Sequence, residues 1–460
     1  MEEIAFGTDG WRATLDTFTS PRVRAVGQAV ADYLESEGHG GRTVAVGYDA
    51  RGSSPGFADD LADVLAGNGF DVLLPERDLP TPALAWTVRE RGLAGGLMLT
   101  ASHNPPAYNG VKFLPGDGVP ALPEVTERIE ANLREADPSG EAGERREEDL
   151  VGPYLDHAVS FLEDLEGGFD LSGLRVCYDA MHASGRGVTD RLLEEAGAEV
   201  ERLRTDHDPE FGGSSPEPKA ERLEHLIARV AEGDAEMGVA NDGDADRVAV
   251  VTPRGFVDAN LLYVLLYEHL LESNSGAAVR TVSTTFLVDR VAEAHGEGTY
   301  ETAVGFKWVA EAMGEHDALF GGEESGGYGL TSHLRNKDGV LIAGLAAAAH
   351  AEEPLDERLA RIRETYGEAH QDRVSVDCPG DRKSAVLSAL ADELPDSVAG
   401  VDVNRVNDVD GFKILLADGS WLLVRPSGTE PKLRVYAEAG SEERVDELLE
   451  AGRELVEPLI

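Results

Sequence analysis

Three aspartates stand at alternate positions in the stretch NDGDADR, residues 241–247. The apolar runs on either side, AEMGVA and VAVV, predict that this stretch is a turn between two strands. Carboxylates at alternate positions can converge on a hard divalent cation, which prefers oxygen ligands. Like charges in a buried turn repel one another unless something neutralises them. We therefore predict that Asp242, Asp244 and Asp246 bind a metal ion, and a plain acidic turn is the alternative.

A second polar segment, RPSGTEPKLR at residues 425–434, contains groups that suit a phosphate. The guanidinium of Arg425, the hydroxyls of Ser427 and Thr429, and the backbone amides around Gly428 can all donate hydrogen bonds to one anion. A hairpin turn is the alternative, because Pro and Gly are common in turns. A metal site in the same chain favours phosphate binding.

A third segment, GGEESGG at residues 321–327, presents two carboxylates and a hydroxyl between glycines. The side chains of Glu323, Glu324 and Ser325 can exchange hydrogen bonds with the vicinal hydroxyls of a sugar. A flexible acidic loop without a ligand is the alternative.

The stretch TASHNPPAYNGVK, residues 100–112, is a loop that its prolines and asparagines keep irregular. Ser102 in it needs a base or a metal to become a nucleophile. His103 is adjacent and so faces elsewhere, and no Asp stands nearby to orient its ring, so a hydrolase triad is weakly supported. Lys112 ends the loop and is one of only seven lysines. A desolvated lysine can exchange a proton with a sugar hydroxyl, which arginine cannot do.

Strand-like and helical patterns alternate through most of the chain and predict α/β layers. Two segments share the order strand, Tyr-Asp-Ala, polar loop, helix, strand, so that Asp49 corresponds to Asp179. A third, weaker copy runs from RTVSTTFLVDRVAEAHG to TYETAVG. The polar stretch 135–149 is expected to be a link. We predict three related α/β domains and a smaller C-terminal α+β domain, over residues 1–145, 150–253, 254–366 and 368–460.

The charge composition limits the kinds of molecule that this protein can bind. Asp and Glu number 87 against 41 Lys and Arg, which gives a formal net charge of −46. A surface this negative repels nucleic acid and suits a salt-rich cytosol, as in a halophile. The apolar runs are too short to cross a membrane, and the acidic first residues carry no secretory signal, so we expect a cytoplasmic protein. Cys177 and Cys378 form no disulfide framework.

These segments, in this order, resemble the α-D-phosphohexomutase family, from FGTDGWRA at the start to RPSGTEPKLRVY near the end. The resemblance implies mixed sheets between helices and four domains around a central cleft. It also implies an isomerase that interconverts hexose 1-phosphates and 6-phosphates, with hexose phosphates as its partners and a monomer or homodimer as its state. Mg²⁺ and a glucose 1,6-bisphosphate intermediate are the implied cofactors.

The resemblance also assigns roles. It implies that Ser102 is carried as phosphoserine, that one of its oxygens joins the three aspartates on Mg²⁺, and that Lys112 is the general base. Positive charge around the phosphoryl group would come from Arg12, His103 and Arg247. The implied sugar and phosphate contacts come from Lys307, Glu323, Ser325, Arg425, Ser427, Gly428 and Thr429.

Two departures from the family pattern bear on the substrate. Gly327 stands where many phosphomannomutase-like members carry His, and Ala13 stands where many have Gly. The first favours glucose over mannose. A loop that grips two other hydroxyls does not sense C2, so mannose stays open. Phosphoglucosamine mutase, a metal-dependent sugar-phosphate phosphatase and a sugar-phosphate sensor are the competing functions.

Overall fold

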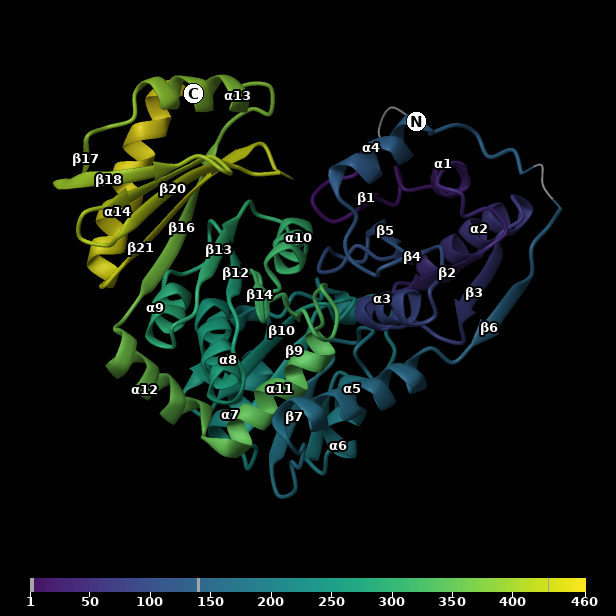
Figure 1. The fold of residues 1–460 in the computed structure, drawn as a ribbon, viewed down its shortest axis with the longest axis horizontal. Helices are drawn as coiled ribbons and strands as arrows, with labels where there is room; N and C mark the ends of the chain where they lie inside the picture. The colour runs from purple at the N-terminus through teal and green to yellow at the C-terminus, as the bar shows by residue number, and fades with distance from the viewer. Residues whose placement is uncertain (1–3, 139–140, 429) are drawn as a thin grey trace.

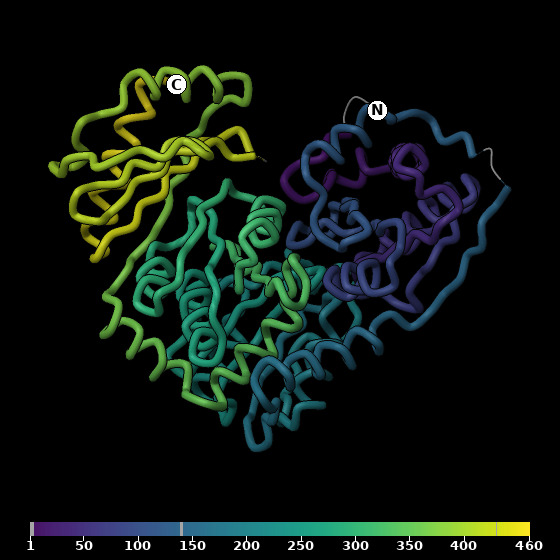
Figure 2. The backbone as a smooth tube through the Cα atoms, in the orientation of Figure 1, coloured from purple at the N-terminus to yellow at the C-terminus, as the bar shows by residue number. Residues whose placement is uncertain are grey.

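The computed structural model describes residues 4–138, 141–428 and 430–460. Four sheets follow one another along the chain, and we name the parts that carry them domains I to IV. Figure 1 shows domain I in purple and blue at the right, domains II and III in the middle, and domain IV in yellow-green at the upper left. Figure 2 traces the chain through them in that order. The predicted α/β fold with a final α+β domain is confirmed.

Domain I has a six-stranded mixed sheet in the order β1-β5-β4-β2-β3-β6. Its strands are β1 (Trp11–Thr14), β2 (Thr43–Tyr48), β3 (Asp71–Pro75), β4 (Gly95–Leu99), β5 (Tyr108–Pro115) and β6 (Arg145–Glu148). Its helices are α1 (Ser20–Ser36), α2 (Ser54–Gly67), α3 (Thr81–Glu90) and α4 (Pro123–Ala131). β5 runs antiparallel to both of its neighbours, β1 and β4.

Domain II has a five-stranded mixed sheet in the order β11-β10-β9-β7-β8. Its strands are β7 (Arg175–Asp179), β8 (Glu199–Leu203), β9 (Met237–Asn241), β10 (Val248–Thr252) and β11 (Gly255–Phe256). Its helices are α5 (Val151–Glu166), α6 (Thr189–Glu195) and α7 (Glu224–Glu232). β9 and β10 form an antiparallel hairpin whose turn holds the three aspartates, as the sequence predicts.

Domain III has a four-stranded mixed sheet in the order β13-β12-β14-β15. Its strands are β12 (Ala278–Thr281), β13 (Thr299–Thr302), β14 (Phe320–Gly322) and β15 (Tyr328–Leu330). Its helices are α8 (Ala259–Ser273), α9 (Leu287–Ala294), α10 (Phe306–His316), α11 (Gly339–Glu352) and α12 (Leu355–Tyr366).

Domain IV has a six-stranded antiparallel sheet in the order β16-β21-β20-β19-β18-β17. Its strands are β16 (His370–Asp377), β17 (Ser397–Val398), β18 (Val401–Asn407), β19 (Phe412–Leu416), β20 (Trp421–Pro426) and β21 (Lys432–Ala439). Helices α13 (Lys383–Asp392) and α14 (Glu442–Val456) complete it, and apolar side chains of both pack with the strands in one core.

The repeated sequence unit forms the same structure three times. In each copy two strands run parallel and a helix connects them: β2–α2–β3, β7–α6–β8 and β12–α9–β13. The weak third copy is therefore confirmed. Because polar loops follow the carboxyl ends of these strands, each unit can present side chains at one edge of its sheet.

Helix α11 packs against α5, α6 and α8 and is buried over almost its whole length. An apolar helix surface on every side needs neighbours on every side. Gly344 in α11 allows close contact, since an added Cβ would lie 2.6 Å from Leu162 of α5 and 2.7 Å from Leu192 of α6. No helix in the described part of the chain is long and apolar enough to cross a membrane.

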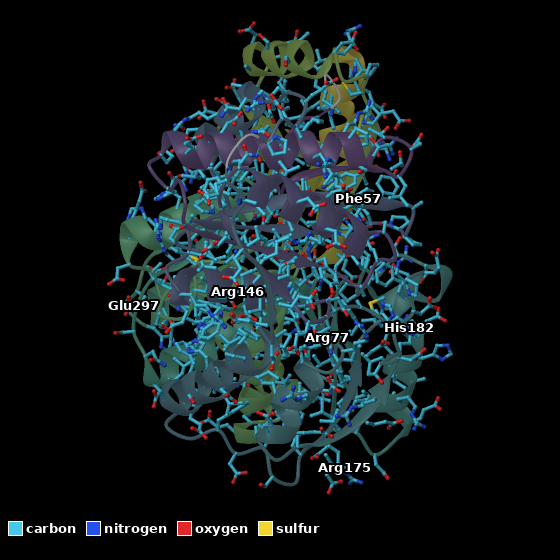
Figure 3. The ribbon with its side chains drawn as sticks, turned by 90° about the vertical axis from the view of Figure 1, so that its right-hand side faces the viewer. Phe57, Arg77, Arg146, Arg175, His182 and Glu297 are labelled. Carbon is cyan, nitrogen blue, oxygen red and sulfur yellow. The ribbon has the colours of Figure 1, made fainter. Side chains whose placement is uncertain are left out.

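The junction between domains I and II differs from the prediction of a simple link. β6 lies inside the polar stretch 135–149 and adds a parallel strand to the edge of the domain I sheet. Its side chains are largely exposed, and Arg145 forms ion pairs with Asp59 and Asp63 of α2, so no apolar pattern marks the strand. Arg77 of domain I donates to the carbonyl of Arg186 in domain II, and Figure 3 shows Arg77 where the two domains meet.

Candidate active site

Ser102 lies in the loop between β4 and β5 and is fully buried. Its φ of +49° falls in the left-handed region, which non-glycine residues seldom adopt. Its Oγ donates a hydrogen bond to Asp242 Oδ2 at 2.7 Å, across the junction of domains I and II. A Cβ added to Gly243 would lie 2.3 Å from the Ser102 carbonyl oxygen, so glycine allows the two loops to touch. The loop of domain I is thereby fixed on the loop of domain II.

Arg51 holds the backbone of the Ser102 loop in this conformation. The guanidinium is buried, and its Nε lies 2.9 Å from Asp49 Oδ2. It donates hydrogen bonds to four carbonyl oxygens of the loop, those of Ser102, Asn104, Pro105 and Tyr108. The sequence shows Arg51 directly after the Tyr-Asp-Ala motif, but the carbonyls that it binds lie about fifty residues further along. The residues next to Arg51 in the sequence therefore give no sign that it supports the Ser102 loop.

The three aspartates of the β9–β10 turn converge as predicted. All three are fully buried, and one oxygen of each lies within 4.8 Å of the others. The Oδ1 atoms of Asp244 and Asp246 are buried and find no hydrogen-bond partner in the described part of the chain. Burial and the two neighbouring carboxylates raise the pKa of Asp242 well above its usual value. Buried carboxylate oxygens without hydrogen-bond partners fit a divalent cation with oxygen ligands.

Lys112 is buried at the centre of this charge cluster. Its ammonium lies 2.8 Å from Asp244 Oδ2 and 2.9 Å from both Asp246 Oδ2 and Asp9 Oδ2. Burial alone would lower the pKa of Lys112, but the carboxylates of Asp244, Asp246 and Asp9 raise it well above its usual value. Lys337 joins the same cluster, 2.8 Å from Asp246 Oδ2.

Asp9 and Lys337 are site residues that sequence reasoning missed. Asp9 belongs to the FGTDGWRA motif, and Lys337 is one of the seven lysines, so scarcity was a signal that could have found it. Burial opposes ionisation of Asp9, yet Lys112, Lys337 and Arg12 lower its pKa well below the usual value. Asp9 is therefore ionised and helps to hold both lysines in place.

Two arginines and a histidine border the aspartates. Arg12 lies 2.8 Å from Asp9, and the backbone N–H of Arg247 donates to Asp242 Oδ1 at 3.2 Å. The Nε atoms of both arginines are buried without a hydrogen-bond partner in the described residues, so they are free to donate to an anion. His103 Nδ1 lies 3.3 Å from Ser102 Oγ. Burial, Arg247 and Arg12 lower the pKa of His103 to about 2, so the ring is neutral beside the unmodified serine and adds no charge in this state.

The EES loop lies between β14 and β15 of domain III. Glu323 is buried and accepts a hydrogen bond from the backbone N–H of Gly305 at 3.0 Å, whereas Ser325 is exposed. Burial raises the pKa of Glu323 to about 7, although Lys337 opposes the shift. Lys307, on α10, donates to the carbonyl of Gly7 at 3.5 Å.

The segment at the end of β20 carries the predicted phosphate ligands. Arg425 is buried, with its Nε and Nη2 each 2.9 Å from Asp410 Oδ2. Ser427 is buried and Gly428 is exposed. Thr429 lies outside the described residues. The Asp410 carboxylate also accepts from the backbone N–H of Val304, which ties this segment to domain III.

The N-terminal loop around Thr8 brings these segments together. A Cβ added to Gly305 would lie 2.7 Å from Thr8 Cγ2, and one added to Gly428 would lie 3.4 Å from Thr8 Oγ1. Domains I, III and IV therefore meet at this loop, one residue before Asp9. Among the described residues, Arg425 and Ser427 make no hydrogen bond or ion pair with the three aspartates, and Arg425 pairs with Asp410 instead.

Comparison with known proteins agrees with this arrangement. Models described as phosphoglucomutase/phosphomannomutase domains I, II, III and C-terminal match residues 3–139, 153–255, 258–366 and 377–455. A probable phosphoglucosamine mutase of Methanopyrus kandleri is 36% identical, over 96% of this chain and 95% of its own length. A phosphoglucomutase/phosphomannomutase of Thermococcus kodakarensis is 32% identical, over 98% of each chain.

Solved structures share the whole fold. A Thermus thermophilus crystal structure, described as a candidate phosphomannomutase, superposes with a TM-score of 0.85 at 34% identity over 99% of each chain. The four domain models, in order, span nearly all of the chain. The chain therefore belongs to the phosphoglucomutase/phosphomannomutase family and is an isomerase of the phosphohexomutase type.

Proposed function

We propose that this enzyme interconverts hexose 1-phosphate and hexose 6-phosphate, with glucose preferred, through a phosphoserine at Ser102 and a glucose 1,6-bisphosphate intermediate. One observation carries the proposal. The hydroxyl of Ser102 lies 2.7 Å from Asp242 in a converging aspartate trio, and Lys112 binds the other two aspartates. A nucleophile, a cation site and a proton-exchanging group therefore meet at one point.

Asp242, Asp244 and Asp246, together with a phosphoserine oxygen, would hold Mg²⁺. The buried, unpaired oxygens of Asp244 and Asp246 support this assignment. The cation would supply positive charge to the phosphoryl group as it transfers, which is where catalysis of this reaction acts.

The chain's own residues would carry the phosphoryl group in two steps. In the first, the bond from Ser102 Oγ to phosphorus breaks and a bond from the sugar hydroxyl to phosphorus forms. The carboxylates that raise the pKa of Lys112 would hold Mg²⁺ in the active state, and the positive charge of the ion would lower that pKa again, so that Lys112 could take the hydroxyl proton. The bisphosphate then rotates within the site, so that its other phosphoryl group faces Ser102. In the second step its other phosphoryl group bonds to Ser102 Oγ, and the proton returns to the freed sugar oxygen. The unpaired Nε donors of Arg12 and Arg247 would bind the phosphoryl oxygens.

The distal half of the substrate would be held by domains III and IV. The Glu323 carboxylate and the exposed Ser325 hydroxyl suit the sugar, and Lys307 lies two residues after Gly305, whose N–H donates to Glu323. Arg425, Ser427, Gly428 and Thr429 are the proposed phosphate ligands. An incoming phosphate would compete with Asp410 for the guanidinium of Arg425.

The structure gives a physical meaning to Gly327. A Cβ at this position would lie 2.4 Å from Lys337 Cδ, so the stem of Lys337 occupies the space that a larger residue would need. At position 327 this chain therefore cannot make the substrate contact that a histidine side chain would make in relatives that carry His there. Phosphoglucosamine mutase is the second candidate, because the 36% identical relative carries that name.

The Ser102→Ala variant tests the reaction. We expect it to lose turnover by more than about 1,000-fold while still binding sugar phosphate, and mass spectrometry should find phosphate on Ser102 in the wild type. The exposed Ser172→Ala change is the matched control. Full activity of Ser102→Ala in a coupled assay would contradict the phosphoserine role.

The preferred hexose is determined by measuring kcat/KM side by side on glucose 1-phosphate, mannose 1-phosphate and glucosamine 1-phosphate. A kcat/KM that is higher for glucosamine 1-phosphate than for glucose 1-phosphate would make phosphoglucosamine mutase, the second candidate, the correct function. Release of free phosphate instead of hexose 6-phosphate would indicate a phosphatase.

A further inference from the structure

A second group of metal-ligating side chains lies away from the aspartate cluster, where three helices end. His269 and Glu272 stand one helical turn apart near the end of α8, Glu352 is the last residue of α11, and Glu166 is the last residue of α5. The ligand atoms of His269, Glu272 and Glu352 lie within 4.8 Å of one another. Helix C-termini carry partial negative charge, so all three helices favour a cation at this point.

The orientation of the His269 ring points to a missing ligand. Its side chain is only 4% exposed, and its Nε2 lies 2.9 Å from Glu166 Oε2. An Nε2–H that donates to Glu166 leaves the lone pair of Nδ1 directed at the other two carboxylates. Nδ1 has no hydrogen-bond partner in the described residues, and it lies 3.3 Å from Glu352 Oε2 and 3.8 Å from Glu272 Oε2. A lone pair that faces two carboxylates is repelled unless a proton or a metal ion stands between them, and the titration below distinguishes the two.

The surrounding charges leave room for that cation. Arg358 and Arg361 pair with the acids of this region, which are Glu268, Glu272, Glu352 and Glu353. Together with Glu166, five carboxylates surround two guanidinium groups. Arg358 donates to Glu272 Oε1 at 2.9 Å and, by a longer bond from Nη2, to Glu272 Oε2 at 3.3 Å, so a metal ion would share Oε2 with this arginine. Five carboxylates against two guanidinium groups leave an excess of negative charge in this region.

We propose that His269, Glu272 and Glu352 bind a divalent transition metal ion, with Zn²⁺ as the best match, and that Glu166 is the positioning residue behind His269. One imidazole with two carboxylates is a common donor set for Zn²⁺, and the imidazole disfavours Mg²⁺. Four ligands at about 2.1 Å in a tetrahedron lie about 3.4 Å apart, close to the separations found here. A polar cavity of about 290 Å³, lined in part by His269 and Glu352, has space for water as a further ligand.

The site would fasten α8 to α11, with Glu166 linking α5 to it. None of these residues belongs to the active site, so the metal would act on stability and not on turnover. A bound ion that favours the folded state raises its stability in proportion to the logarithm of the metal concentration.

The test is a Zn²⁺ titration of the full chain after EDTA treatment, with millimolar Mg²⁺ present to fill the aspartate trio. We expect one Zn²⁺ per chain by elemental analysis, and a higher melting temperature with Zn²⁺ than without it. Asp244→Asn, which disables the aspartate trio, should bind the same single Zn²⁺. Loss of Zn²⁺ binding in Asp244→Asn would assign the ion to the active site and overturn the proposal.

His269→Gln should bind no Zn²⁺ and show no Zn²⁺-dependent rise in melting temperature. His350→Gln is the matched control, since His350 is another buried histidine with an unpaired Nδ1, on α11. Zn²⁺ binding by His269→Gln equal to that of the control would overturn the proposal.

Glu352→Gln keeps the test decisive if His269→Gln does not fold. Glu352 is 60% exposed, so its substitution leaves no buried charge behind. We expect its Zn²⁺ affinity, and that of Glu166→Gln, to fall by roughly 10- to 100-fold. Wild-type affinity in both variants, or no Zn²⁺ bound by the wild type, would also overturn the proposal.

Discussion

Two buried lysines of this chain, Lys112 and Lys413, differ in what surrounds their ammonium groups. Lys112 lies among three carboxylates at the junction of domains I and II. Lys413 lies on β19, where domain IV meets domain III, and is completely buried. Its ammonium is 2.8 Å from Glu301 Oε2 and 4.0 and 4.2 Å from the ring centroids of Phe286 and Trp421.

The two environments shift the two pKa values in opposite directions. The carboxylates overcome burial at Lys112 and raise its pKa. At Lys413, burial and the nearby Arg280 lower the pKa to about 7. The paired carboxylate of Glu301 is shared with Arg280, and Glu438 opposes the shift more weakly. Glu301 itself is kept ionised, since Arg280 and Lys413 overcome its burial and lower its pKa to about 2.

The difference shows that burial alone does not decide the charge of a lysine. The number of carboxylates close to the ammonium group also contributes. Replacing each lysine by arginine, which keeps the positive charge, tests what the lysine does. Lys112 is placed for chemistry, whereas Lys413 fastens domain IV, which carries the proposed phosphate ligands, to domain III.

Lys112→Arg should have the largest effect, on turnover. Arginine keeps a positive charge for the three carboxylates but does not release its proton, so we expect kcat to fall by about 10²- to 10⁴-fold. A coupled mutase assay measures the loss, and circular dichroism checks that the fold is retained. The exposed Lys219→Arg change is the control and should leave kcat within about twofold. A kcat for Lys112→Arg within tenfold of the wild type would refute proton transfer by Lys112.

Lys413→Arg should have the reverse effect, on stability. The larger guanidinium must fit between two rings, and it holds a permanent charge beside Arg280, so we expect a loss of about 2–3 kcal/mol in the free energy of unfolding. Urea denaturation measures this loss, and kcat of the folded protein should stay near that of the wild type. A variant as stable as the wild type would show that Lys413 is already fully charged and well compensated.

The sequence contains the local part of this picture. Asp242, Asp244 and Asp246 are neighbours along the chain, so their convergence follows from one turn. The βαβ units were also predictable, because their alternation of strand and helix is a short-range pattern.

The sequence could not reveal the partners that fold together from distant positions. Asp9 and Lys112 of domain I meet Lys337 only because domain III packs against domain I. Nothing in the types of their sequence neighbours specifies which lysine joins which carboxylate. Strand β6 was missed for a related reason, since its side chains are charged and exposed and its pairing depends on the edge of β3. The neutral state of His103 likewise depends on burial of its ring and on the nearby charges of Arg247 and Arg12, and all three arise only in the folded chain.

The pH dependence of stability should show the smallest effect, and it isolates Lys413 through the variant Lys413→Met. The folded state releases the Lys413 proton near pH 7, whereas the unfolded chain keeps it to about pH 10.4. Between these values the unfolded state binds more protons, so the contribution of Lys413 to stability rises with pH and is lost as the pH falls to 7.

Methionine fills the same space without a charge, so the stability of the Lys413→Met variant should lack this rise. The difference in unfolding free energy between wild type and Lys413→Met, followed from pH 6 to pH 9, should therefore shift in favour of the wild type as pH increases. A difference that is constant over this range would mean that the pKa of Lys413 is not lowered, and the contrast with Lys112 would then be one of position and not of charge.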